Sequence, residues 1–204
     1  MLKIFTLDKI LIFLLIALIS SCSQENVKET SQNTETKQAS TPHKSLTKAQ
    51  RKIYRDGITA LYNNDYPKAK KIFDEFIRNR PEMAGAYSNL ALLHFKKNEY
   101  AESLKLVNKA IELNPEQAQA YNLRGQIYII NGNINKAKDD YLKAVKIKPA
   151  YKNAQYNLAL LYDIYLQEIE LAIKHYEIYM KLIKKPDDAT KEWIQHLKGT
   201  LKNA

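Results

Sequence analysis

The chain has 204 residues, of which 45% are hydrophobic and 26% are charged. Its few helix breakers, 5 glycines and 6 prolines, favour a globular body built from long helices. A formal net charge of +10 would suit nucleic acid, an anionic membrane or an acidic protein. The single cysteine, Cys22, excludes an intrachain disulfide.

The amino terminus has the layout of an export signal. Lys3 and Lys9 precede ten consecutive apolar residues, 10–19. Ten helical residues span about 15 Å, roughly half of a bilayer core, so we expect a signal peptide over residues 1–21 rather than a permanent membrane span. Because export removes the chain from nucleic acid, an anionic membrane or an acidic protein is left as the partner for its positive charge.

The apolar run ends in Ile19, Ser20, Ser21 and Cys22, which resemble the bacterial lipobox. The resemblance implies a diacylglycerol thioether on Cys22, cleavage before it, and acylation of its new amino group, which together give a firm membrane anchor. The alternative is a spent signal peptide whose last residues happen to include a cysteine. Ser23 follows where inner-membrane lipoproteins carry aspartate, so resemblance to enterobacterial sorting favours the periplasmic face of the outer membrane.

A polar stretch over residues 23–45 separates this signal from the body, with one valine as its only large aliphatic residue. Such a stretch cannot bury enough apolar surface to fold. We therefore expect residues 22–45 to be a lipidated cysteine followed by a disordered tether that spans about 25 to 29 Å on average.

The sequence of the body repeats every 34 residues, which is the distance along the chain from Gly57 to Ala91. Small residues recur at two registers, larger residues follow four positions after the second, and prolines recur near the end of each copy. These residues are Gly57, Ala91, Gly125 and Ala159; Ala69, Ser103 and Ala137; Phe73, Val107 and Tyr141; and Pro81, Pro115 and Pro149.

This pattern resembles the tetratricopeptide repeat, a helix-turn-helix unit of about 34 residues. The resemblance implies an all-α fold, an α-solenoid of about four repeats over 46–186, at about 50–83, 84–117, 118–151 and 152–186. Turns are expected at 63–65, 98–99 and 131–133, where Asn, Asp and Gly tolerate turn backbone angles. The fourth unit contains one extra residue, so we expect its helix pair to be irregular.

Residues 187–204 are expected to form a capping helix on the last repeat. Asp187 and Asp188 favour a helix start. An apolar stripe is then expected at every fourth residue, with Trp193 as a packing residue rather than a binding residue. The stripe consists of Ala189, Trp193, Leu197 and Leu201.

The resemblance also implies a concave groove lined by the first helix of each repeat. Its apolar, aromatic and amide side chains suit an extended or helical peptide, and the alternative is that some of them only pack. The groove residues are Tyr54, Ile58, Leu61, Tyr62, Ser88, Leu92, Phe95, Lys96, Gln119, Asn122, Gln126, Ile129, Ile130, Asn153, Tyr156, Leu160, Asp163 and Ile164.

Repeats of this family that clamp a terminal carboxylate use Lys and Arg together with Asn at groove positions; here Asn89 and Asn157 lie beside those positions, but the matching basic set is missing. The basic residues instead cluster in or near the second helix of the repeats. We read the lysines as a solvated outer face, with a patch for an acidic partner as the alternative. They include Lys68, Lys70 and Lys71; Lys143, Lys146 and Lys148; and Lys181, Lys184 and Lys185.

Motifs for chemistry are missing from the sequence: the four histidines are scattered, and no glycine-rich phosphate loop appears. We expect no enzyme, no cofactor and no metal, and partners that are other envelope proteins. The first hypothesis is an envelope scaffold for assembly of a pilus, secretion or outer-membrane machine. The alternatives are a regulatory adaptor that docks cell-wall hydrolases or proteases, and a non-catalytic subunit of an enzyme complex. The oligomeric state is open.

Overall fold

The computed structural model describes residues 45–202, and contacts group the chain from Thr47 onward into one compact unit. The expected signal peptide, Cys22 and nearly all of the tether lie outside the described residues. Among the helices that are described, none is both long enough and apolar enough to cross a membrane.

The described part is all helical, and it confirms the expected α-solenoid of four helix pairs followed by a last helix. We call the first helix of each pair the inner helix and the second the outer helix. The pairs are α2 (Lys48–Tyr62) and α3 (Tyr66–Asn79), α4 (Ala84–Lys96) and α5 (Tyr100–Leu113), α6 (Ala118–Ile130) and α7 (Ile134–Ile147), and α8 (Lys152–Leu160) with η1 (Leu161–Leu166) and α9 (Ile169–Leu182); α10 (Asp188–Lys202) ends the body.

Small residues allow the two helices of a pair to approach closely. A Cβ atom on Gly125 would lie 2.5 Å from Cε1 of Tyr141, and one on Gly57 would lie 2.8 Å from Cγ2 of Ile72. Tyr141 is buried, so glycine at position 125 leaves room for its ring. The repeated small residues therefore fix the distance between inner and outer helix.

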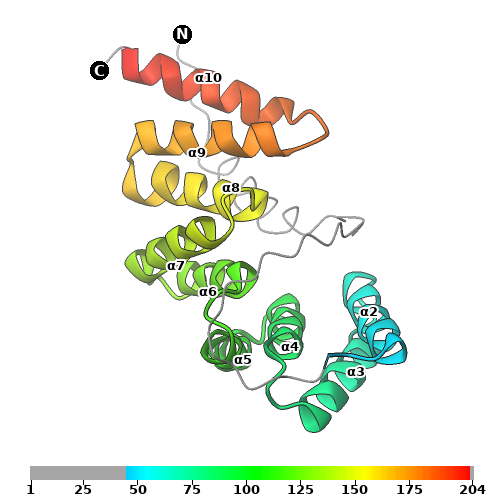
Figure 1. Cartoon of the computed structure of the whole chain (residues 1–204). Coiled ribbons are helices and arrows are strands. Elements are labelled where there is room, and N and C mark those ends of the chain that lie inside the picture. Colours follow the sequence, from blue (N-terminus) through cyan, green and yellow to red (C-terminus); the bar gives the residue numbers. More distant parts are fainter. Residues whose placement is uncertain (1–44, 203–204) are drawn as a thin grey trace. The chain divides into compact units, whose positions relative to one another are not determined.

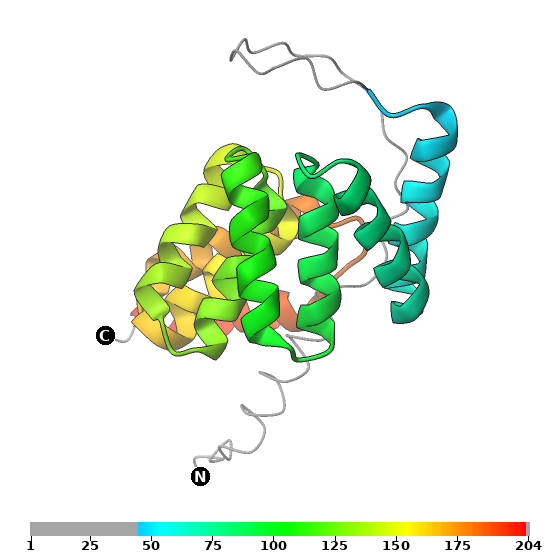
Figure 2. The ribbon, with the colours of Figure 1, turned by 90° about the horizontal axis from the view of Figure 1, so that it is seen from below.

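The body curves with its inner helices on the inside. The backbone of each inner helix lies close to that of the inner helix of the next repeat, whereas within the described body the backbones of neighbouring outer helices lie farther apart. Figure 1 shows α2, α4, α6 and α8 along one side of the arc and the outer helices along the other, and Figure 2 shows the same stack turned by 90°. The inner helices therefore line the concave face.

Three of the inner helices end in the same way. The residue that closes each turn adopts the left-handed region, at Asn64 (φ 61°), Asn98 (φ 61°) and Gly132 (φ 72°). The next backbone N–H donates to a carbonyl five positions earlier, as from Asp65 to Ala60 over 2.9 Å. This is the arrangement that satisfies the last carbonyls of a helix, and it needs a residue that tolerates positive φ.

The fourth inner helix ends differently because its repeat has one extra residue. Residues Leu161–Leu166 form a π-helical turn, and Gln167 takes the left-handed position at φ 55°. The closing N–H of Glu168 donates to Tyr162, six positions earlier, over 2.9 Å. A π-turn adds one residue without ending the helix. The irregularity expected in the fourth repeat is therefore this π-turn, which takes up the extra residue.

The buried face of α10 differs from the expected one. Asp187 caps the helix through the N–H of Thr190 (3.0 Å), and the stripe that packs on the body is Thr190, Ile194, Leu197 and Leu201. Ala189 and Trp193 are exposed instead. Positions spaced strictly by four drift around a helix of about 3.6 residues per turn, whereas spacings of four, three and four stay on one face.

Candidate functional site

The concave face is the candidate interaction surface, and part of the expected groove is open there. Tyr62, Lys96 and Ile130 occupy equivalent positions of successive repeats, at the ends of three inner helices. Tyr62 is 47% exposed, Ile130 is 37% exposed, and Lys96 and Gln126 are partly exposed. We call Tyr62, Lys96, Gln126 and Ile130 the groove surface.

Three expected groove residues are not available for a ligand, and for these the prediction is wrong. Ser88, Asn122 and Leu61 are buried. Asn122 bonds to Asn157 of the next inner helix, Ser88 holds the equivalent position one repeat earlier, and Leu61 belongs to the core of the first repeat. The groove positions known for this family state which face of a single helix a residue occupies. They do not state how closely the next inner helix approaches that face.

Side-chain hydrogen bonds join neighbouring inner helices. Asn89 Nδ2 donates to the Tyr54 hydroxyl (2.8 Å), and Asn157 Nδ2 donates to Asn122 Oδ1 (2.9 Å). Burial raises the pKa of Tyr54 to about 12. At the junction between α4 and α6, Leu123 stands where the other junctions have asparagine. No described residue bonds to the buried Ser88 hydroxyl there.

Most other expected groove residues are partly buried and support the core at their base. Tyr156, for example, packs against Tyr176 and Tyr179, with ring centroids 5.8 and 4.8 Å away. Such residues present only an edge to the groove. The set with this double character is Tyr54, Ile58, Leu92, Phe95, Ile129, Tyr156 and Leu160; Asn153 and Ile164 are also partly exposed, and Gln119 is exposed.

An ion pair at the middle repeat was not predicted from the sequence. Arg124 donates to both carboxylate oxygens of the buried Asp140, each over 2.7 Å, and to Asn108 Oδ1 over 2.9 Å. Its guanidinium also lies 5.5 and 5.7 Å from the ring centroids of Tyr121 and Tyr128. Three helices are thereby joined by one side chain. The signal available in the sequence was that Asn108 and Asp140 lie at the same distance, 16 residues, before and after Arg124.

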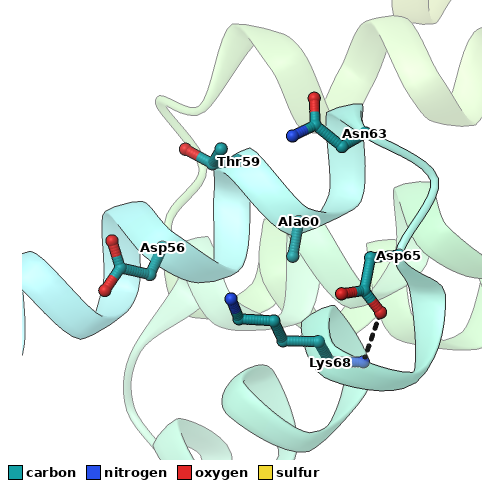
Figure 3. A pocket seen from close by; sticks show the side chains of 6 residues that line it. All are labelled: Asp56, Thr59, Ala60, Asn63, Asp65 and Lys68. Atoms are coloured by element: carbon teal, nitrogen blue, oxygen red, sulfur yellow. Dashed lines mark hydrogen bonds between the residues drawn. The ribbon is translucent and has the colours of Figure 1, made fainter.

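A hollow of about 180 Å³ lies between α2 and α3, near the turn that joins them. Figure 3 shows its lining, where Asp65 accepts a hydrogen bond from the backbone N–H of Lys68 over 3.2 Å and so caps α3. None of its lining residues belongs to the expected groove. They are Asp56, Thr59, Ala60, Asn63, Asp65 and Lys68.

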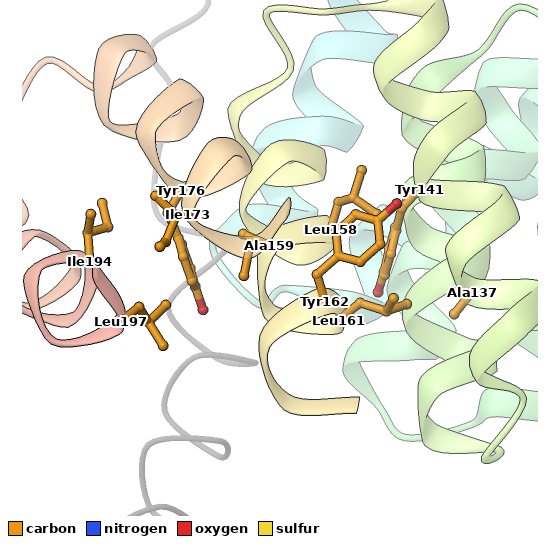
Figure 4. Close-up of a cluster of buried hydrophobic side chains, with 11 residues drawn as sticks. Ala137, Tyr141, Leu158, Ala159, Leu161, Tyr162, Ile173, Tyr176, Ile194 and Leu197 are labelled. Carbon is orange, nitrogen blue, oxygen red and sulfur yellow. The ribbon is translucent and has the colours of Figure 1, made fainter. Parts of the chain in front are cut away.

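The carboxyl-terminal end of the body carries a cluster of side chains from α9 and α10 that also differs from expectation. Figure 4 shows Ile194 and Leu197 of α10 beside Ile173 and Tyr176 of α9. Trp193 points elsewhere: it is 43% exposed and stacks on His196 with centroids 5.0 Å apart. The prediction that Trp193 packs in the core is therefore wrong.

Asp163 of η1, an expected groove residue, is bonded to α9 and to α10. Its Oδ2 accepts hydrogen bonds from the Trp193 indole N–H (2.6 Å) and the Tyr176 hydroxyl (3.1 Å). Burial, and after it the negative charge of Asp163, raises the pKa of Tyr176. We call Asp163, Tyr176 and Trp193 the Asp163 site.

One histidine is buried in the last repeat. His175 Nδ1 lies 2.7 Å from Gln155 Oε1, and its ring stacks on Tyr162 with centroids 5.7 Å apart. Burial, with a smaller contribution from Lys174, lowers the pKa of His175 to about 4. The ring of His175 is thus packed and hydrogen-bonded within the last repeat. Within residues 45–202 no group of three His, Cys, Asp or Glu side chains is placed to hold a metal ion.

Comparison with known proteins identifies the repeats. Two family models described as tetratricopeptide repeat match residues 54–118 and 118–151. No curated protein matches the chain.

Solved structures of such proteins share the fold. TTC0263, a thermophilic TPR protein in Thermus thermophilus, has a TM-score of 0.60 and 18% identity, covering 72% of this chain and 80% of its own. MamA from Desulfovibrio magneticus RS-1 has a TM-score of 0.54 and 23% identity over 65% and 75%. The first TPR of Spaghetti, bound to HSP90 peptide SRMEEVD, has 0.53 and 23% over 58% and 93%.

Proposed function

We propose that this chain, which carries tetratricopeptide repeats, is a scaffold that binds a peptide or helix of a partner protein along its concave face. The repeat fold itself implies a protein–protein interaction scaffold, and proteins of this kind are generally non-catalytic interaction modules. A structure of similar fold, the first TPR of Spaghetti, is bound to a peptide. The observation that carries the proposal is the groove surface, whose apolar and polar side chains are exposed together.

Two exposed apolar side chains, one in the groove and one on an outer helix, allow the proposal to be tested. Ile130 ends the inner helix α6 and is 37% exposed, and it has Tyr62 and Lys96 at the equivalent positions of the preceding repeats. Apolar contacts beside a cation and an amide give a bound peptide both affinity and register. Leu142, on the outer helix α7, is 39% exposed, and it serves as the matched control.

The experiment is capture of partners by the full chain after crosslinking in cells. Ile130→Asp is expected to reduce recovery of the specific partner at least five-fold, because it places a charge in the apolar part of the groove. Leu142→Asp should leave recovery unchanged, and both variants should melt like the parent chain. Equal recovery with all three proteins would exclude the groove as the binding surface.

The identity of the captured partner separates the narrower hypotheses. We favour an envelope scaffold for assembly of a pilus, secretion or outer-membrane machine, and recovery of such components would support it. Recovery of cell-wall hydrolases or proteases would support a regulatory adaptor. Co-purification with one enzyme at fixed stoichiometry would support a non-catalytic subunit.

We also propose that the scaffold is attached to the outer membrane by lipid on Cys22. The support comes from the sequence, in which a basic start is followed by an apolar run and then by a lipobox-like segment that ends in the chain's only cysteine. Cys22→Ala should yield an unprocessed or soluble protein in membrane fractionation and mass spectrometry. Unchanged fractionation together with unchanged mass would exclude the anchor.

A further inference from the structure

We propose that the Asp163 site is the subsite of the groove that receives a basic side chain, Lys or Arg, of the bound partner segment. This inference rests on the proposed function, since it assigns chemistry to one end of the same concave face. Asp163 takes the position that Phe95 and Ile129 hold in the two preceding repeats. A segment that follows the groove surface beyond Ile130 therefore reaches Asp163 next.

The charge of Asp163 is only partly satisfied within the described residues. Both of its described hydrogen bonds come from neutral donors, and both end on Oδ2. Among residues 45–202, no Lys, Arg or His nitrogen forms an ion pair with it within 4.0 Å. Its Oδ1 has no donor in that part of the chain, and the residue is partly exposed. A carboxylate in this state is a ready acceptor for a charge-assisted hydrogen bond.

The second half of the site is the exposed indole of Trp193. Its N–H is held by Asp163, so the ring is fixed beside the carboxylate, and its 43% exposed surface belongs to the only tryptophan of the chain. A cation close to an indole face is attracted by the ring, and tryptophan is the best aromatic residue for this contact. Carboxylate and indole together fit an ammonium or guanidinium group, whereas an acidic side chain would meet the charge of Asp163.

Trp193 stacks on His196 and donates to Asp163, and its ring is not part of the core on which α10 packs. The core contacts of α10 are made by Ile194 and Leu197 on another face of the helix. α10 is the last helix of the described body. Trp193 is thus placed at the end of the stack, where a ligand would complete its environment.

The test is selection of random twelve-residue peptides displayed on phage against the purified full chain and its Asp163→Asn variant. Asparagine keeps an oxygen that accepts from Tyr176 and Trp193, so the fold is retained while the charge is lost. Peptides selected by the parent chain are expected to carry Lys or Arg at one constant position. Selection on Asp163→Asn should lose that preference.

A selected peptide is then synthesised with its basic residue or with Gln, and binding is followed by the fluorescence of Trp193. We expect Asp163→Asn to weaken the basic peptide about ten-fold or more and to leave the Gln peptide unaffected. Asp139→Asn, which removes an exposed carboxylate from the outer helix α7, should change either affinity by less than about two-fold, within the usual variation of surface charges.

The outcomes separate this inference from the proposed function. Peptides that lose binding with Ile130→Asp but lack a basic residue, or that bind Asp163→Asn equally well, would overturn the Asp163 site and leave the groove standing. Recovery of no peptide whose binding depends on Ile130 would overturn both.

Discussion

At the scale of single residues, the polar side chains are specified by what packs around them more than by their repeat position. Ser88, Asn122 and Tyr156 occupy equivalent positions, yet one is buried without a described partner, one is bonded to Asn157, and one packs among tyrosines. The repeat register predicted that these positions are alike. It could not predict their differences, because each depends on the residue opposite in the next helix.

His175 gives a prediction at this scale. Its pKa is lowered to about 4 in the folded chain from 6.5, so between these values the unfolded chain binds more protons than the folded one. The free energy of unfolding should therefore decrease as pH falls from about 6.5 to 4, by roughly 2 to 3 kcal/mol. Urea denaturation at several pH values measures it.

The matched variants are His175→Gln and His196→Gln. Gln at position 175 does not titrate, so the loss of stability between pH 6.5 and 4 should become smaller by about the same amount. His196 is exposed, so His196→Gln is the control and should keep the decrease that His175 causes. Identical curves for all three proteins would contradict the assignment of His175 as a buried neutral residue.

At the scale of helices, the periodicity of small residues and prolines predicted the helix pairs, and physical limits on helix geometry decided the rest. The extra residue of the fourth repeat predicted an irregularity, and the structure places it as a π-turn over Leu161–Leu166. The stripe on α10 was predicted one residue off at Ala189 and Trp193, because spacing by four was read as one face. The start of the helix at Asp188 and the period of an α-helix give the observed face.

Close approach of paired helices is tested at Gly125. Gly125→Ala should lower the free energy of unfolding by about 1 to 3 kcal/mol, because the new Cβ would meet the buried ring of Tyr141 at 2.5 Å. Gly199→Ala is the control, since a Cβ there has nothing within 4 Å. Within a helix it should stabilise by up to about 1 kcal/mol. Thermal or urea unfolding that ranks the two variants the other way would contradict the packing described.

At the scale of the whole molecule, curvature creates a concave face whose open part is smaller than the sequence indicated. Successive inner helices lie in contact, Ser88 and Asn122 are buried, and the groove surface is accessible. The positive charge of the body comes chiefly from lysines outside this set, and it bears on solubility and encounter with anionic surfaces. Binding specificity in this account comes from the groove surface and, at its carboxyl-terminal end, from Asp163 and Trp193.

The most direct measurement of the central claim is site-specific photocrosslinking in cells, with a photoreactive residue placed at Ile130 or Tyr62 in the groove or at Leu142 on the outer helix. All three side chains are exposed to a similar degree, at 37%, 47% and 39%. The account predicts a discrete partner adduct from the two groove positions and none from Leu142. An adduct from Leu142 with none from Ile130 and Tyr62 would contradict it.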